Sequence, residues 1–180
     1  MKEIEAKILE INRKKVEETL TGQGAKKIFD GDIQTFFFDF KDGAIVKAKN
    51  VLRLRKVENK TELTFKKVHF TQSAKVAEEY SVEVSNFETM KTILENLGLS
   101  TTENMQKHRI SYRLDNARFD IDCYFGNYGY IPEFLEIEAE NSGSLNKYAS
   151  LLGFKAKDCL PWSTNELIHY YSSKKGKTEG

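Results

Sequence analysis

The chain has 180 residues, of which 39% are hydrophobic, so it can fold as one domain, or at most two small ones, around its own core. This excludes a peptide hormone and a mini-protein held together by disulfides. Lysine and arginine total 28 against 27 for aspartate and glutamate, and the net charge of +1 argues against a strongly basic DNA-binding protein. We therefore expect no nucleic-acid partner.

The two cysteines, Cys123 and Cys159, form neither a Cys-x-x-Cys pair nor a disulfide framework, so we expect two free, buried thiols. The first residues lack a basic segment followed by an apolar run, and no stretch approaches the ~18 apolar residues of a membrane span. These features predict a cytoplasmic protein without a membrane partner.

Alternation with period two predicts eight strands, in chain order near residues 2–10, 33–40, 50–57, 61–69, 77–85, 106–114, 117–124 and 133–140. Helical spacing, in most cases followed by glycine, predicts helices over residues 12–22, 87–97, 144–152 and 164–173. The fold class is therefore α+β. We expect a single domain over residues 1–173 and a disordered polar tail over residues 174–180.

A weak internal repeat accompanies this order. Residues 3–6 read Glu-Ile-Glu-Ala, and the same four residue types recur at 136–139, each time before a helix that ends at glycine. The repeat indicates either two related halves of the fold or a chance match.

Nearly every predicted strand has one charged face and one apolar face. Glu5 and Lys7 alternate with Ile4 and Ala6, for example, and Arg53 alternates with Leu52. Such alternation is typical of an antiparallel sheet with a solvated outer face. However, most strands carry a single sign of charge at positions two apart, where like charges repel across ~6.5–7 Å, and this favours a bound partner.

Eight strands can close into a small barrel that holds side chains or one ligand, so the charged faces can also line a tunnel. Guanidinium and ammonium groups bind phosphate oxygens, and the candidate cations are Lys7, Arg53, Arg55, Lys66, Lys107 and Arg109. Carboxylates suit Mg²⁺ or Mn²⁺, and the candidate ligands are Glu3, Glu5, Asp122, Glu136 and Glu138. Two divalent ions (about +4) and a triphosphate (about −4 to −5) would leave this set close to neutral.

These residues resemble the CYTH domain family, the triphosphate tunnel metalloenzymes, which includes class IV adenylyl cyclases, thiamine triphosphatase and inorganic triphosphatases. The resemblance covers residues 3–138. It rests on an ordered set: Glu3, Glu5 and Lys7; Arg53 and Arg55; Lys66; Lys107 and Arg109; Asp122; and finally Glu136 and Glu138.

The resemblance implies an eight-stranded antiparallel tunnel that binds a triphosphate through its basic residues and one or two divalent metals through its carboxylates. Glu3, Glu5, Glu136 and Glu138 are then metal-ligand candidates, and Asp122 is a further ligand or a water-positioning group. Glu79 and Glu83 lie where many members carry acidic residues. Arg113 and Arg118 either extend the set of basic residues that binds the triphosphate, as we expect for Arg113, or pair with nearby carboxylates.

The segment between Asp122 and Glu136 departs from the bacterial cyclases, which have a shorter connection there. Its tyrosines either stack on a base or cover one end of the barrel.

Our main functional hypothesis is metal-dependent hydrolysis of the terminal phosphoanhydride of inorganic triphosphate, ATP or thiamine triphosphate, with Lys7 and Asp122 as the candidate catalytic residues. Lys7 would act as a base only if its pKa is lowered. The alternatives are cyclisation of ATP to cyclic AMP, and a non-catalytic module that binds polyphosphate. We expect a monomer or a homodimer.

Overall fold

A computed structural model describes residues 4–70 and 75–175 of the chain. The elements are, in order, β1 (Ile4–Ile8), α1 (Arg13–Gly22), β2 (Lys26–Phe40), α2 (Ala44–Lys47), β3 (Val51–Val57), β4 (Lys60–Phe70), β5 (Lys75–Val84), α3 (Phe87–Asn96), β6 (Leu99–Leu114), β7 (Ala117–Tyr124), the 3₁₀ turn η1 (Gly126–Tyr128), β8 (Phe134–Ala139), α4 (Ser142–Leu151), the 3₁₀ turn η2 (Ala156–Asp158) and α5 (Thr164–Lys175).

The eight strands form one sheet in the order β1-β8-β7-β6-β2-β3-β4-β5, and every pair whose register is described is antiparallel. The predicted fold class, eight antiparallel strands flanked by helices, is confirmed. The order has two ends, so the pairing among the described residues does not close the sheet into a ring. On its open side, β1 forms a bridge with Leu160, whose N–H and C=O bond to the backbone of Lys7 at 2.9 and 2.8 Å.

The chain divides into two compact units. Unit 1 comprises residues 1–31 and 107–180, and unit 2 comprises residues 32–106. The long strands β2 and β6 contribute to both, and each unit has its own hydrophobic core.

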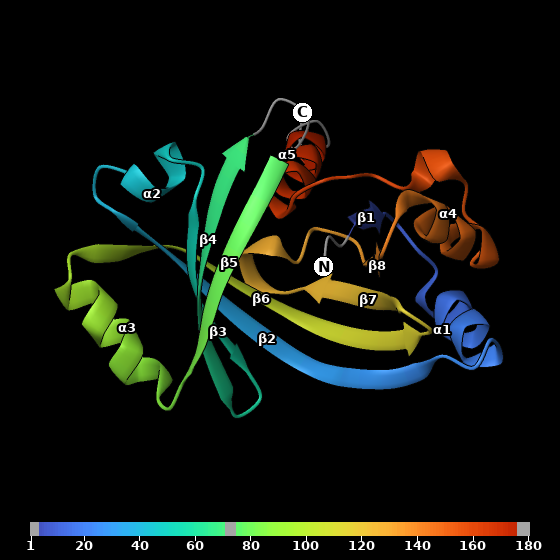
Figure 1. The fold of residues 1–180 in the computed structure, drawn as a ribbon, viewed down its shortest axis with the longest axis horizontal. Coiled ribbons are helices and arrows are strands. Elements are labelled where there is room, and N and C mark those ends of the chain that lie inside the picture. Colours follow the sequence, from blue (N-terminus) through green and yellow to red (C-terminus); the bar gives the residue numbers. More distant parts are fainter. Residues whose placement is uncertain (1–3, 71–74, 176–180) are drawn as a thin grey trace. The chain divides into compact units, whose positions relative to one another are not determined.

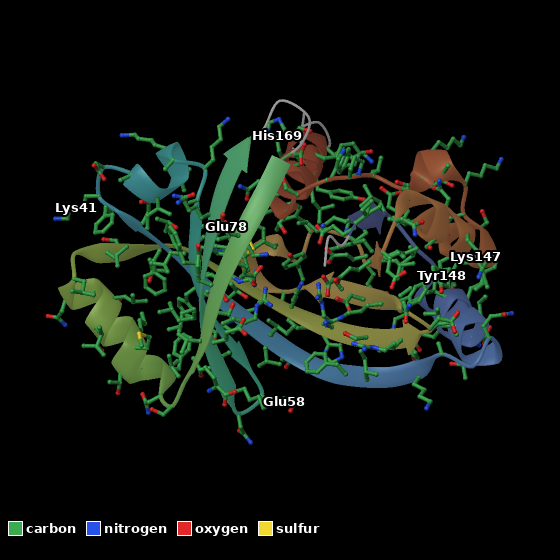
Figure 2. The ribbon with its side chains drawn as sticks, viewed as in Figure 1. Lys41, Glu58, Glu78, Lys147, Tyr148 and His169 are labelled. Carbon is green, nitrogen blue, oxygen red and sulfur yellow. The ribbon has the colours of Figure 1, made fainter. Side chains whose placement is uncertain are left out.

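In unit 1, helices α1 and α4 cover the apolar face of the sheet (Figure 1). Val16 and Leu20 of α1 are buried against this face, together with Ile137 of β8. Tyr148 of α4, labelled in Figure 2, meets the ring of Phe119 on β7 edge-on at 5.5 Å between centroids. Because the apolar residues alternate along each strand, the charged residues of β1, β6, β7 and β8 lie on the opposite face.

In unit 2, α3 lies against the apolar face of β2, β3 and β4 (Figure 1). Leu94 of α3 packs with Phe38 and Leu54, all of them buried. The charged residues on the opposite face of these strands and of β5 include Arg53, Arg55, Lys66 and Glu79.

The strands and helices were predicted at nearly the right places, with three differences. Strands β2 and β6 start at Lys26 and Leu99, seven residues before the predicted starts, because these first halves are mostly exposed and show no apolar alternation. Helix α2 was not predicted, and α5 continues to Lys175, two residues into the expected tail. The other tail residues, 176–180, lie outside the described part of the chain.

Both cysteines are free, as expected, but they are half-buried where full burial was predicted. In the described ranges, no helix is both long and apolar enough to cross a membrane.

Candidate functional site

The charged face of unit 1 carries acidic and basic residues on four adjacent strands. The register places Lys7 of β1 opposite Glu136 of β8, and Glu136 opposite Asp120 of β7. One step along, Glu5 lies opposite Glu138, and Glu138 lies opposite Arg118. Residues far apart in the sequence are thereby brought into contact.

Lys7 is buried, with 3% of its surface exposed, and its ammonium group donates to two carboxylates. The Nζ atom lies 3.2 Å from Oε1 of Glu5 and 3.1 Å from Oε1 of Glu136. Burial alone lowers the pKa of Lys7, but Glu136 and Glu5 outweigh this effect and raise it above the ordinary value. Lys7 therefore stays protonated at neutral pH, and the lowered pKa that a role as base requires is not found.

Arg109 of β6 is held by three carboxylates. Its guanidinium binds Asp122 bidentately, with Nε and Nη2 both 2.6 Å from the carboxylate oxygens. Nη2 also lies 3.0 Å from Oε2 of Glu136, and Nη1 donates to Asp120. Flat bidentate pairing of this kind is also how a guanidinium binds a phosphate.

Asp122 lies at the centre of this network and is 1% exposed. In addition to Arg109, it accepts a hydrogen bond from Nζ of Lys107 at 2.7 Å. Burial raises the pKa of Asp122, but Lys107 and Arg109 overcome this and lower it to about 2. The group is therefore ionised at neutral pH and is suited to accept hydrogen bonds rather than to donate a proton.

For Lys107, in contrast, burial is the stronger effect. It lowers the pKa of the ammonium group below the ordinary value, although Asp122 raises it. The ammonium also lies over the ring of Tyr124, 5.7 Å from its centroid.

Tyr124 begins an aromatic group that continues into the segment before β8. Its ring stacks on Phe134 at 6.0 Å and meets Tyr128 edge-on at 6.1 Å, and Tyr128 contacts Tyr130 at 6.4 Å. Because these tyrosines pack on one another, their arrangement favours the interpretation that the segment covers one end of the strands.

Unit 2 has a second cluster of predicted residues. Glu79 of β5 accepts from Arg53 Nη2 at 3.2 Å and from Lys66 Nζ at 2.7 Å. Although burial raises the pKa of Glu79, Lys66 and Arg53 lower it below the ordinary value. Arg55 lies opposite Glu62 in the register, and Glu62 accepts a hydrogen bond from the buried hydroxyl of Thr64 at 3.0 Å. Glu78, labelled in Figure 2, points to the other side of β5.

The remaining predicted residues lie outside these clusters or at their margins. Glu3 lies outside the described residues. Arg113 is exposed, directly opposite Arg118 in the register, and the two line a pocket of about 570 Å³ together with Glu138. Glu83 lies opposite Glu62 on β4.

The contacting residues on the charged face of unit 1 form what we call the unit 1 cluster: Glu5, Lys7, Lys107, Arg109, Ser111, Arg118, Asp120, Asp122 and Glu136. Two of them, Asp120 and Ser111, were not selected from the sequence. Asp120 is 4% exposed and binds both Arg109 and Arg118, and Ser111 is fully buried opposite it. The alternation of Asp120 with Asp122 was visible in the sequence, but only the cross-strand register brings Asp120 between two arginines.

Within the described part of the chain, no group of three or more His, Cys, Asp or Glu side chains is arranged as a metal site. Two carboxylates do approach each other: burial and then Glu136 raise the pKa of Glu5, although Lys7 lies between them and lowers it in part. Carboxylate oxygens are the donor type that Mg²⁺ and Mn²⁺ take, so Glu5 and Glu136, with Glu138 beside them, have the donor chemistry of a divalent-cation site.

Comparison with known proteins identifies the family. The family model described as the CYTH domain matches residues 1–147, which include every predicted site residue. The chain belongs to the CYTH domain family. No protein with curated annotation matches its sequence.

Solved structures show that the chain shares its fold with other proteins. The PH1012 protein from Pyrococcus horikoshii OT3 is 24% identical with a TM-score of 0.73, covering 93% of this chain and 99% of that one. A Vibrio parahaemolyticus protein, described as a candidate adenylate cyclase, is 16% identical with a TM-score of 0.72, covering 93% and 97%. HpAC1 from Hippeastrum, described as an adenylyl cyclase candidate with a dominant triphosphatase activity, is 15% identical with a TM-score of 0.65, covering 94% and 96%.

Proposed function

We propose that this CYTH protein hydrolyses the terminal phosphoanhydride bond of a triphosphate in a reaction that depends on Mg²⁺ or Mn²⁺. The observation that carries the proposal is the unit 1 cluster. It holds two lysines and an arginine, each largely buried, in contact with carboxylates on the adjacent strands. Burying so many charges costs free energy that their mutual pairing only partly offsets, which argues for a function beyond stability.

The cations are assigned to the phosphate oxygens. Arg109 offers a planar fork, whereas Lys7 and Lys107 offer compact charges, and all of them now donate to carboxylates. A triphosphate would replace some of these carboxylates as acceptor, so the cations exchange one anionic partner for another. In unit 2, Arg53, Arg55 and Lys66 are assigned to phosphate oxygens in the same way.

The acidic residues Glu5, Glu136 and Glu138 are assigned to the divalent cation, and Glu3 is included on the resemblance of the sequence to the family. The bound cation supplies neutralisation of charge on the phosphoryl oxygens. Asp122, ionised and surrounded by donors, is assigned to orient the attacking water or to complete the ligand set. Lys7 is assigned as a charge-stabilising group and not as a base, because its pKa is raised.

Hydrolysis is chosen over cyclisation of ATP on two grounds. The tyrosines after β7 pack on one another, which supports a covering role over base recognition. The description of HpAC1, which shares the fold, gives triphosphatase as its dominant activity.

The test is incubation of the purified protein with tripolyphosphate or ATP and with Mg²⁺ or Mn²⁺, resolving phosphate, ADP and cyclic AMP. Release of terminal phosphate is expected. Cyclic AMP as the main product would establish the cyclase, and tight binding of tripolyphosphate without turnover would establish a binding module; either result contradicts hydrolysis.

Glu5→Gln tests the assigned metal ligand. The substitution nearly keeps the shape but removes one charge, and we expect metal-dependent turnover to fall by at least about 100-fold, which corresponds to about 2.7 kcal/mol. Glu18→Gln is the matched control, because the pair that Glu18 forms with Lys14 at 3.9 Å is exposed. Unchanged turnover in Glu5→Gln would remove Glu5 from the site.

A further inference from the structure

Asp120 of β7 occupies a position between two arginines. Its Oδ2 accepts from Nη1 of Arg109, and its Oδ1 accepts from Nε of Arg118 at 2.9 Å. The side chain is almost completely buried, whereas the side chain of Arg118 is 39% exposed. One buried carboxylate thus joins a buried guanidinium to a half-exposed one.

The surroundings of Arg118 restrict its direction further. Its Nη2 lies 3.3 Å from the hydroxyl of Ser111, which is buried opposite Asp120 on β6. Nε and Nη2 are therefore both directed at the sheet. A guanidinium has five N–H donors, and these two contacts leave three of them for another acceptor.

Those remaining donors lie beside a pocket. Arg118 lines the pocket of about 570 Å³ together with Arg113, which occupies the directly opposite position of β6. The carboxylate residues Asp115, Glu138 and Glu140 also line it, and Glu138 is one of the residues assigned to the divalent cation. Two cations placed opposite each other repel unless an anion lies near both. Asp120 supplies an anion to Arg118, on its buried side, whereas a phosphate in the pocket would lie near both arginines.

We propose that Asp120 is a positioning residue that orients Arg109 and Arg118 toward phosphoryl oxygens, and that Arg118 is itself a phosphate-binding residue. The proposal rests on the proposed function, since it concerns how the same site holds its substrate. Asp120 does not contact substrate in this arrangement; it acts through the two arginines. The row of phosphate-binding cations thereby extends from Arg109 into the pocket.

The experiment compares Asp120→Asn, Arg118→Gln and the double variant with the wild-type protein. The amide of asparagine keeps the size of the side chain, but its NH₂ group cannot accept from a guanidinium, so one of the two arginines loses its hydrogen bond to residue 120. Binding of tripolyphosphate is measured by calorimetry, and kcat and KM are measured with Mg²⁺.

Asp120→Asn is expected to raise both the Kd and the KM for tripolyphosphate about 10-fold, as for the loss of one charge-assisted hydrogen bond, with kcat changing much less. Arg118→Gln is expected to weaken binding about threefold. The double variant should lose less than the product of the two single losses, because both substitutions disable the same contact of Arg118.

Glu17→Gln is the matched control. It removes one carboxylate from an arginine pair in the same unit, that of Glu17 with Arg13 at 3.0 Å on α1, and should leave Kd and KM unchanged. A purely structural role for Asp120 would lower the melting temperature of Asp120→Asn and leave the Kd and KM of the folded protein unchanged, which overturns the proposal.

Two further outcomes separate the proposals. If the wild-type protein neither binds nor hydrolyses tripolyphosphate, the proposed function fails and this inference fails with it. If the wild-type protein binds and Asp120→Asn binds equally well, only the inference is wrong. Should Asp120→Asn not fold, Arg118→Gln decides alone, since its partly exposed side chain can be replaced without emptying the core, and an unchanged Kd overturns the role of Arg118.

Discussion

Lys7 illustrates how this site departs from a solvated charged surface. A buried ammonium loses hydration, and here Glu5 and Glu136 together compensate for that loss so fully that its pKa rises. Removing the lysine would leave Glu136 buried in contact with Arg109, with Lys107 acting on it from farther away.

We therefore expect Lys7→Met to destabilise the protein by about 3 kcal/mol, the lower end of the range for breaking a buried ion pair, because Arg109 still compensates part of the charge. Chemical unfolding measures this change. Lys14→Met is the control: its exposed pair with Glu18 should contribute less than about 0.5 kcal/mol. Equal effects of the two substitutions would contradict the view that the Lys7 pair is a buried one.

For single residues, the alternation in the sequence predicted on which face of a strand each charged side chain of the proposed site lies. It selected Lys7, Arg109, Asp122 and Glu136, which the structure brings into contact. It did not select Asp120, because alternation assigns a face to a residue but not the partners on neighbouring strands. Those partners depend on register, which the turns and the core determine.

Among the elements, α2 begins at N–H groups that are bonded to aspartate side chains: Asp42 accepts from Ala44 at 3.1 Å, and Asp39 accepts from the two residues after it. The carboxylate of Asp39 is buried and accepts from the backbone N–H groups of Phe40, Ile45 and Val46 at 2.7, 2.9 and 3.0 Å. Burial raises the pKa of Asp39, but these N–H groups outweigh it and lower the pKa below its ordinary value.

The sign of the resulting pH dependence follows. Because the pKa is lower in the folded state, ionised Asp39 stabilises the fold above its unfolded pKa of about 3.9, and this contribution is lost as the pH falls through the lowered folded pKa. Urea unfolding should therefore show a larger stability difference between wild type and Asp39→Asn at pH 7 than at pH 3. A difference that does not change with pH would contradict this assignment.

Helix α1 holds to the sheet of unit 1 through a narrow apolar stripe. Leu20 is fully buried, so Leu20→Ala should cost about 2–5 kcal/mol, measured by urea unfolding. Leu97→Ala, at a residue that is 67% exposed after α3, should have little effect. If the two variants lost similar stability, the loss in Leu20→Ala could not be attributed to the packing of α1 on the sheet.

Local sequence patterns were sufficient to predict some of the helices and strands but not all of them. Helices α1, α3 and α4 each follow an asparagine whose side chain accepts a backbone hydrogen bond, and their apolar spacing was visible in the sequence. The first halves of β2 and β6 carry no such pattern. They are strands because neighbouring backbone pairs with them, which is a property of the sheet and not of the segment.

For the whole molecule, the net charge of +1 conceals strong local order. Cations and carboxylates alternate over the charged face of unit 1 and neutralise one another through contacts such as those of Arg109. We therefore expect the protein to fold without a metal or substrate.

Thermal unfolding tests this expectation. In a chelator, the protein should unfold in a single cooperative transition; added Mg²⁺ and tripolyphosphate should raise Tm in a concentration-dependent way, by an amount equivalent to about 2.7 kcal/mol at 100 times Kd. Sulfate at equal ionic strength is the control and should shift Tm far less. Loss of the fold in chelator, or no shift with tripolyphosphate, would contradict the scheme.

The sequence by itself determined the kind of fold and supplied the candidate residues of the proposed site, because period-two alternation, helix caps and charge type are local properties of the chain. It also determined the family, since the ordered charged residues are recognisable without coordinates. Only the tertiary structure decided that the pKa of Lys7 is raised, so that it stays a cation, and that Asp120 binds two arginines. Both depend on burial and on the register between strands that are distant in the chain, and no local pattern encodes either.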